Sequence, residues 1–180
     1  MELLNLKQMK KTNITIILSL IILIIFSSCN KYRDIEGTVD FYLLESYETL
    51  DNSCGIDEST VETKNKPFIK YDDLLSYNSK RHYFKISDNA IKSIKNMDLS
   101  VFGIAFGIKA NNELIYTGYF WPSYSSASCD WIVIDPLMIS NNGKLYIKLG
   151  YPGEFENNPV IDKRNDESIL NIFKRDRKLD

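Results

Sequence analysis

Residues Val101 to Trp131 read VFGIAFGIKANNELIYTGYFWPSYSSASCDW. The first ten are apolar on both faces and include β-branched side chains and two glycines, which predicts a strand buried on both sides rather than a helix. Asn111 and Asn112 follow as a turn, since asparagine tolerates a positive φ. Glu113 to Trp121 then returns as the second strand of a hairpin, and Pro122 ends the pairing because it has no N–H to donate.

A serine-rich loop at 123–129 connects this hairpin to a further apolar strand at 131–135. Four aromatic residues of the hairpin and loop lie close together in sequence: Tyr119, Trp121, Tyr124 and Trp131. Trp and Tyr dominate binding hot spots, so one interpretation is an aromatic contact surface for a protein or peptide. The competing interpretation is that these rings close one end of the core, as aromatic side chains generally do.

The remainder of the chain combines strands with few helices. Alternating apolar and polar residues predict strands at 38–50, 67–77, 81–86 and 144–149. Helices are expected at 88–97, capped by Ser87 or Asp88, and at 166–178. Runs of strands with segregated helices are typical of the α+β class, with a mostly antiparallel sheet and helices on one face.

The N-terminal segment, 1–28, is predicted to be a targeting signal rather than part of the fold. Three lysines (Lys7, Lys10 and Lys11) precede an apolar run from Ile14 to Phe26. This run is shorter than the ~20 residues that a membrane-spanning helix needs, and it has the length of a signal-peptide core. Met9 is an alternative start, because MKKTNITIILSL is the more ordinary opening of such a signal. An ordinary signal peptide and an uncut membrane anchor are the competing interpretations.

Phe26-Ser27-Ser28-Cys29 follows directly, and small residues before a cysteine resemble the lipobox of bacterial lipoproteins. The resemblance implies that Cys29 is lipidated and becomes the first residue of the mature chain, although Phe26 stands where the motif usually has leucine. Two or more acyl chains hold a protein on a membrane. Asparagine and lysine, not aspartate, follow Cys29. By resemblance this favours the outer membrane, with the domain facing the periplasm.

Removing 1–28 leaves a lipid-anchored tether at 29–37 and a single α+β domain at 38–180. This mature portion carries a charge of about −4 and has no basic patch that would indicate nucleic-acid binding. Cys54 and Cys129 are expected to form a disulfide, because leftover cysteines in an oxidising compartment usually pair. Two unpaired thiols are the alternative.

Residues 81–121 contain SDNAIKSIK and VFGIAFGIKANNELIYTGYF, in the order strand, small helix, apolar strand, turn, strand. This order resembles the periplasmic head region of the SecD translocase subunit, whose core is a ferredoxin-like α+β sheet. The resemblance implies a ferredoxin-like fold and bears hardly at all on function. The lipid anchor, the loop after Trp121 and the C-terminal helix depart from that family. As a whole, the chain more closely resembles small, uncharacterised bacterial envelope lipoproteins.

Few residues point to catalysis. His82, the single histidine, is a candidate general base for Ser125 or Ser126, but no nucleophile motif surrounds those serines. A histidine on the strand surface is the competing interpretation. The sequence has no metal, phosphate or dinucleotide motif, so no cofactor or metal is expected. The loop carboxylates at 51, 57 and 58 lack the spacing of a calcium site.

Two basic clusters lie near the C-terminus: Lys163-Arg164, and Lys174, Arg175, Arg177 and Lys178. They either face solvent or touch anionic lipid or a partner. The whole sequence therefore predicts a lipid-anchored, non-enzymatic envelope protein that acts by protein–protein contact through the aromatic loop, which Pro122 and the disulfide preorganise. The alternatives are an inhibitor of an envelope hydrolase that uses the loop as a plug, a small hydrolase using His82 and a loop serine, and a mainly structural role.

Overall fold

A computed structural model describes residues 35–139, 143–155 and 160–180, and those from Glu36 onward belong to one compact unit. The predicted signal peptide, Cys29 and most of the tether lie outside the described residues, as does most of the turn expected at 141–143. The elements in chain order are β1 (Val39–Ser46), η1 (Glu58–Thr60), β2 (Glu62–Thr63), η2 (Tyr71–Asp73), β3 (Leu74–Asn78), β4 (Tyr83–Ile86), α2 (Asp88–Lys95), β5 (Ile104–Ala110), β6 (Glu113–Phe120), β7 (Cys129–Ile134), η3 (Pro136–Met138), β8 (Lys144–Tyr146), β9 (Lys148–Tyr151) and α3 (Glu167–Arg175).

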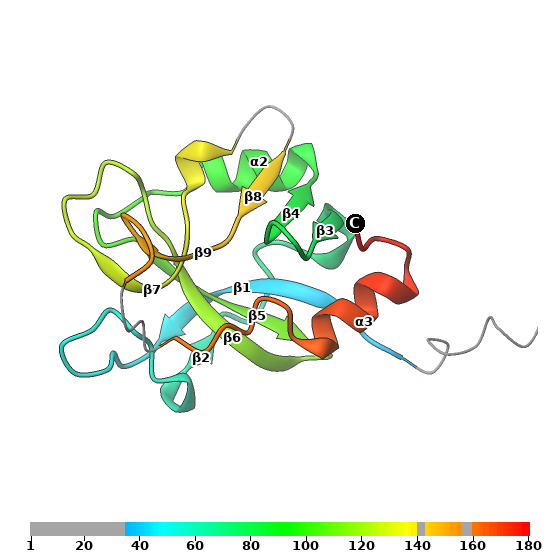
Figure 1. The fold of residues 1–180 in the computed structure, drawn as a ribbon, viewed down its shortest axis with the longest axis horizontal. Coiled ribbons are helices and arrows are strands. Elements are labelled where there is room, and N and C mark those ends of the chain that lie inside the picture. Colours follow the sequence, from blue (N-terminus) through cyan, green and yellow to red (C-terminus); the bar gives the residue numbers. More distant parts are fainter. Residues whose placement is uncertain (1–34, 140–142, 156–159) are drawn as a thin grey trace, which may run out of the picture. The chain divides into compact units, whose positions relative to one another are not determined.

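The described strands form two sheets (Figure 1). Six strands make the large sheet in the order β2-β1-β5-β6-β7-β9, and three make the small sheet in the order β3-β4-β8. Each pair is antiparallel except β6 and β7, which run parallel. The predicted α+β class with mostly antiparallel sheets is confirmed.

The predicted central hairpin is confirmed. β5 pairs with β6 from Ile104↔Phe120 to Ala110↔Glu113, and the turn residues Asn111 and Asn112 have φ angles of 53° and 68°. β5 is largely buried on both faces, as its continuous apolar sequence predicts.

The order of strands differs from the ferredoxin-like arrangement that the SecD resemblance implies. A ferredoxin-like domain has the element order βαββαβ. The elements of this chain follow a different order, and α2 connects the small sheet to the large one. Within the large sheet, β1 pairs antiparallel with β5. The strand expected at 144–149 also divides at Ile147 into β8 and β9, which lie in different sheets. The chain thus passes between the two sheets repeatedly after β3.

One face of the large sheet packs against the small sheet and α3. The Phe106 ring lies 5.5 Å from the Phe41 ring, and Phe41 meets Phe84 of the small sheet at 5.4 Å between centroids. Phe173 of α3 continues the row, 5.6 Å from Phe84. The Phe106 ring packs directly on Gly118, and it leaves no room for a side chain there, since a Cβ at this position would be 2.7 Å from the ring. This face therefore holds an aromatic core between the two sheets.

Both described α-helices begin at side-chain caps. Ser87 Oγ accepts the Ala90 N–H at 3.2 Å at the start of α2, and Asp166 accepts the Ser168 N–H at 2.8 Å at the start of α3. α2 lies beside the small sheet (Figure 1), and α3 packs against the aromatic core through Phe173. After α3 the chain pairs with the outer edge of β3, so this edge is covered.

Candidate functional site

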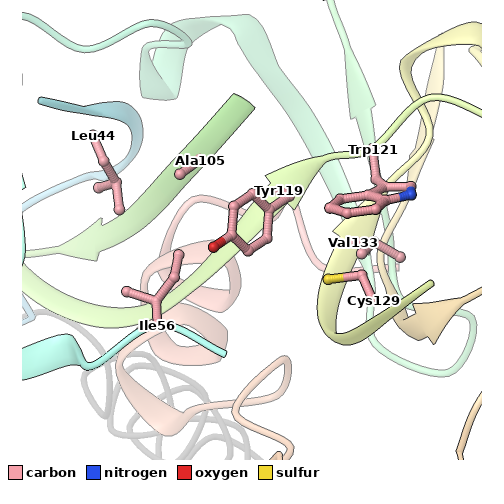
Figure 2. Packing of buried hydrophobic residues seen from close by; sticks show 7 residues of the cluster. All are labelled: Leu44, Ile56, Ala105, Tyr119, Trp121, Cys129 and Val133. Atoms are coloured by element: carbon pink, nitrogen blue, oxygen red, sulfur yellow. The ribbon is translucent and has the colours of Figure 1, made fainter. Parts of the chain in front are cut away.

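The opposite face of the large sheet is covered by a loop rather than by a second sheet. Residues 47–61 form this loop, called the strap below, which folds back on itself at the Thr49↔Ile56 bridge. Ile56 of the strap is 1% exposed. Figure 2 shows the buried cluster on this face: Leu44, Ile56, Ala105, Tyr119, Trp121, Cys129 and Val133. The strap thus completes a second core, called the inner cluster.

The middle of the strap is fastened to the start of β7. Cys54 is bonded to Cys129, with Cα atoms 5.4 Å apart, which confirms the predicted disulfide. Beside this bond, Asp130 accepts hydrogen bonds from Ser53 Oγ at 2.8 Å and from the Cys54 N–H at 3.1 Å. The disulfide and the Asp130 carboxylate therefore both hold the segment of Ser53 and Cys54 against the sheet.

Glu58 fastens the end of the strap to β6. Its Oε1 accepts the Thr117 N–H at 3.1 Å, and its Oε2 pairs with Lys163 at 2.8 Å. Trp131 Nε1 donates to Thr117 Oγ1 at 3.0 Å. Thr117 is fully buried, and β6 pairs with β7 only beyond it, from Tyr119 onward. The carboxylate therefore satisfies a backbone donor that no neighbouring strand accepts.

The four aromatic residues of the predicted contact surface are separated by the fold. Tyr119 and Trp121 are 4% and 3% exposed, and their rings meet edge to face at 5.8 Å. The prediction that these two residues contact a partner directly is therefore wrong, because both are buried within the inner cluster. For them, the interpretation that the rings close the core is right. Trp131 packs partly buried against the same cluster, and Tyr124 is 55% exposed.

Tyr124 belongs to a different, open surface. Its hydroxyl donates to the Leu99 carbonyl at 3.2 Å, which holds it against the turn before β5. In that turn Val101 and Phe102 are 49% and 66% exposed, and Gly103 directs the chain into β5 with a φ of +75°. We call Val101, Phe102 and Tyr124 the distal patch. The sequence pattern places the first two in a buried strand and so misses them.

The 3₁₀ helix η3 adds to the apolar surface at this end of the domain. Leu137 and Met138 are 53% and 64% exposed. η3 packs against α2, and α2 leads directly into the turn that carries Phe102. η3 therefore presents two further large apolar side chains to solvent beside α2.

The loop that carries Tyr124 is ordered by its own hydrogen bonds. The Ser125 N–H donates to the Pro122 carbonyl at 3.0 Å, and the Tyr151 hydroxyl donates to the Ser123 carbonyl at 2.8 Å. Ser125 itself is 6% exposed. Tyr124 is thus displayed from a preorganised loop, so a partner that binds it would have little to order.

His82 and the loop serines lie in separate networks. His82 occupies the turn between β3 and β4 with a φ of 49°, where its Nδ1 lies 3.5 Å from the Tyr77 hydroxyl. Burial, and then the nearby Arg164, lower the pKa of His82. Ser125 Oγ instead contacts the backbone of Ala127. The structure therefore does not assemble the serine and histidine pair that a small hydrolase would use.

Sequence reasoning also missed a buried arginine near this turn. Arg164 is 7% exposed and binds Asp162 through Nε at 2.9 Å and Nη2 at 2.8 Å. Its Nη1 donates to the Ile147 carbonyl at 3.0 Å. Hydrogen bonds from Arg164 hold the pKa of the Asp162 carboxyl below its usual range. The expected exposed patch at Lys163-Arg164 is therefore wrong: Lys163 pairs with the strap and Arg164 fastens the β8–β9 connection.

Other candidate chemistry is sparse in the described parts of the chain. No cluster of three or more His, Cys, Asp or Glu side chains there is arranged to hold a metal ion. Asp57 caps η1 by accepting the Ser59 N–H at 3.0 Å, so this loop carboxylate has a local role. A polar depression of ≈ 610 Å³ lies beside the disulfide, between the strap and Asp130.

Membrane-spanning helices and similarity to known proteins were both considered. Within the described ranges, no helix combines the length and the apolar character needed to cross a membrane. Set against family models, curated proteins and solved structures, the chain gives no significant match.

Proposed function

We propose that this chain is a lipid-anchored, non-enzymatic protein of the bacterial envelope that binds another envelope protein through the distal patch. The observation that carries the proposal is the exposure of Val101, Phe102 and Tyr124 on adjacent segments. Contiguous apolar surface on a small soluble domain usually marks an interaction site. The sequence predicts a contact surface for the whole aromatic loop, and we assign that surface to Tyr124, the exposed aromatic residue of the loop.

The location rests on the N-terminal sequence. Residues 1–28 have the features of a secretory signal, and Cys29 follows it at the position of a lipidated cysteine. The Cys54–Cys129 disulfide supports an oxidising compartment outside the cytoplasm. The outer membrane, with the domain in the periplasm, fits the residues after Cys29.

The expected partner presents an apolar groove rather than a charged surface. Phe102 and Tyr124 supply two rings, which are typical anchors of binding hot spots. The charges nearby in sequence, Lys95 and Asp98, are of opposite sign, so the patch has no strong electrostatic preference. The separation of His82 from the loop serines supports a binding role over hydrolysis.

The test is a binding experiment with matched surface variants. The mature chain captures its partner from envelope extract, the partner is purified, and its Kd is measured against Phe102→Ser and Tyr124→Ser. We expect each variant to weaken binding about tenfold or more, because a hot-spot side chain contributes roughly 2 kcal/mol. Leu75→Ser is the control, since Leu75 is 45% exposed on β3 of the small sheet.

Equal binding by all the variants would reject the distal patch as the contact site. The anchor is tested separately by labelling cells with a palmitate analogue. The unchanged chain should incorporate the label and Cys29→Ser should not. Label retained after Cys29→Ser would reject lipidation at this residue.

A further inference from the structure

The chain enters the domain at the end opposite the distal patch. The Asn111 N–H donates to the Thr38 carbonyl at 3.0 Å, so the start of β1 lies beside the β5–β6 turn. β6 begins at this turn with Glu113 and ends at Phe120, shortly before Tyr124. Its eight residues span roughly 25 Å at the usual rise of an antiparallel strand. The entry point and the patch are therefore separated by about the length of β6.

The C-terminal end of α3 lies at the same entry point (Figure 1). Arg175 Nη2 donates to the Gly37 carbonyl at 2.9 Å. The last turn of α3 and the residues after it also carry Lys174 and Arg177, both exposed. We call the surface formed by Gly37, Thr38, the Asn111-Asn112 turn, Lys174 and Arg177 the base.

The charged side chains at the C-terminal end of α3 differ in whether they have partners within the domain. The carboxylate of Asp176 is occupied by Arg175 at 2.6 Å and by the Tyr71 hydroxyl at 2.7 Å, and that of Asp180 accepts from Ser76. Within the described residues, Lys174 and Arg177 make no ion pair. Lys174 and Arg177 therefore face solvent at the base, as do the carboxylates of Glu36 and Glu113 beside it. The carboxylates of Asp176 and Asp180 instead bind groups of the domain itself.

We infer that the base faces the membrane that holds Cys29 and that Lys174 and Arg177 contact anionic lipid headgroups. The inference rests on the proposed lipid anchor. Residues 30–36 separate Cys29 from Gly37, and such a segment spans at most about 25 Å when fully extended. The charges in this segment cancel, since Lys31 and Arg33 are matched by Asp34 and Glu36. Orientation is therefore set by the base, and the distal patch points away from the bilayer toward its partner.

The experiment uses the full mature, lipidated chain in vesicles of phosphatidylethanolamine and phosphatidylglycerol. A fluorophore is attached at Glu113→Cys beside the base, or at Ser126→Cys in the loop that carries Tyr124; neither side chain is buried. A quencher on the lipid headgroups should quench the first label several times more than the second. Equal quenching, or stronger quenching at residue 126, would overturn the inferred orientation.

Charge reversal isolates the role of the two cations. Lys174→Glu combined with Arg177→Glu should bring the ratio of the two quenching values toward one, whereas Lys92→Glu with Lys95→Glu on the exposed face of α2 should leave it unchanged. An unchanged ratio in the first variant, or an equal loss in both, would remove the headgroup contact. Vesicle flotation is measured in parallel: a chain that does not float with the vesicles rejects the anchor itself, and the orientation with it.

Discussion

The inner cluster and the distal patch take aromatic residues from the same stretch of sequence and place them in opposite environments. Trp121 is 3% exposed and Tyr124, three residues later, is 55% exposed. The difference arises from what lies opposite each ring: Trp121 packs within the cluster that the strap closes, whereas Tyr124 rests on a turn and faces solvent. Aromatic content alone therefore does not distinguish a packing residue from a contact residue.

The largest effect expected from this comparison comes from a pair of truncations. Trp121→Ala should lower the free energy of unfolding by about 4 kcal/mol, the usual cost of removing a large buried ring, whereas Phe102→Ala should change it by less than about 0.5 kcal/mol. Trp121 Nε1 has no hydrogen-bond partner within the described residues, so the loss is one of packing. Urea unfolding of both variants measures it, and equal costs would show that the patch is part of the core.

Removal of the disulfide should come next in size. Cys54→Ala with Cys129→Ala releases a loop of 75 residues in the unfolded chain and should cost about 3 kcal/mol. Binding through the distal patch should persist under conditions where the variant remains folded, because neither cysteine belongs to the patch. Stability is measured by urea unfolding and binding by the Kd for the purified partner. Loss of binding by a folded variant would mean that the strap shapes the patch.

Local sequence patterns predicted individual structural elements better than they predicted which sheet each strand joins. The β5–β6 hairpin, the cap of α2 and the disulfide partners follow from apolar runs, Asn-Asn, Ser87 and cysteine count. The division of 144–149 between two sheets could not be predicted in this way. The break at Ile147 depends on a hydrogen bond from its N–H to the carbonyl of His82, which lies far earlier in the chain. Alternation assigns side chains to faces but does not say which face another segment will cover.

The candidate site was predicted only in part for the same reason. Tyr119 and Trp121 alternate onto one face, but only the tertiary structure shows that Ile56 of the strap packs in the same buried cluster. Val101 and Phe102 extend the apolar run of β5 and so suggested burial, yet the strand begins after Gly103. A glycine three residues into an apolar run was the one local signal that the strand starts late. The interaction of Arg164 with Ile147 had no local signal at all.

A smaller effect tests how the strap is held beside the inner cluster. Glu58→Ala leaves the buried Thr117 N–H without its acceptor and should cost about 2 kcal/mol. Glu58→Gln keeps an oxygen for that N–H and loses only the ion pair with partly exposed Lys163, for which less than about 1 kcal/mol is expected. Thermal unfolding compares the two. Equal losses would assign the role of Glu58 to the ion pair instead of the backbone contact.

The smallest effect is expected in the distal patch itself. Tyr124→Phe keeps the ring and removes the exposed hydrogen bond to the Leu99 carbonyl, so it should cost about 0.5 kcal/mol. Amide exchange should quicken in the turn at 96–103 and remain unchanged in β6, because the Tyr124 hydroxyl bonds to that turn and not to the sheet. A loss several times larger, or faster exchange at Tyr119 and Phe120, would mean that the patch and the inner cluster unfold as one cooperative unit. In that case the two aromatic groups would be parts of a single core, one of them incompletely covered.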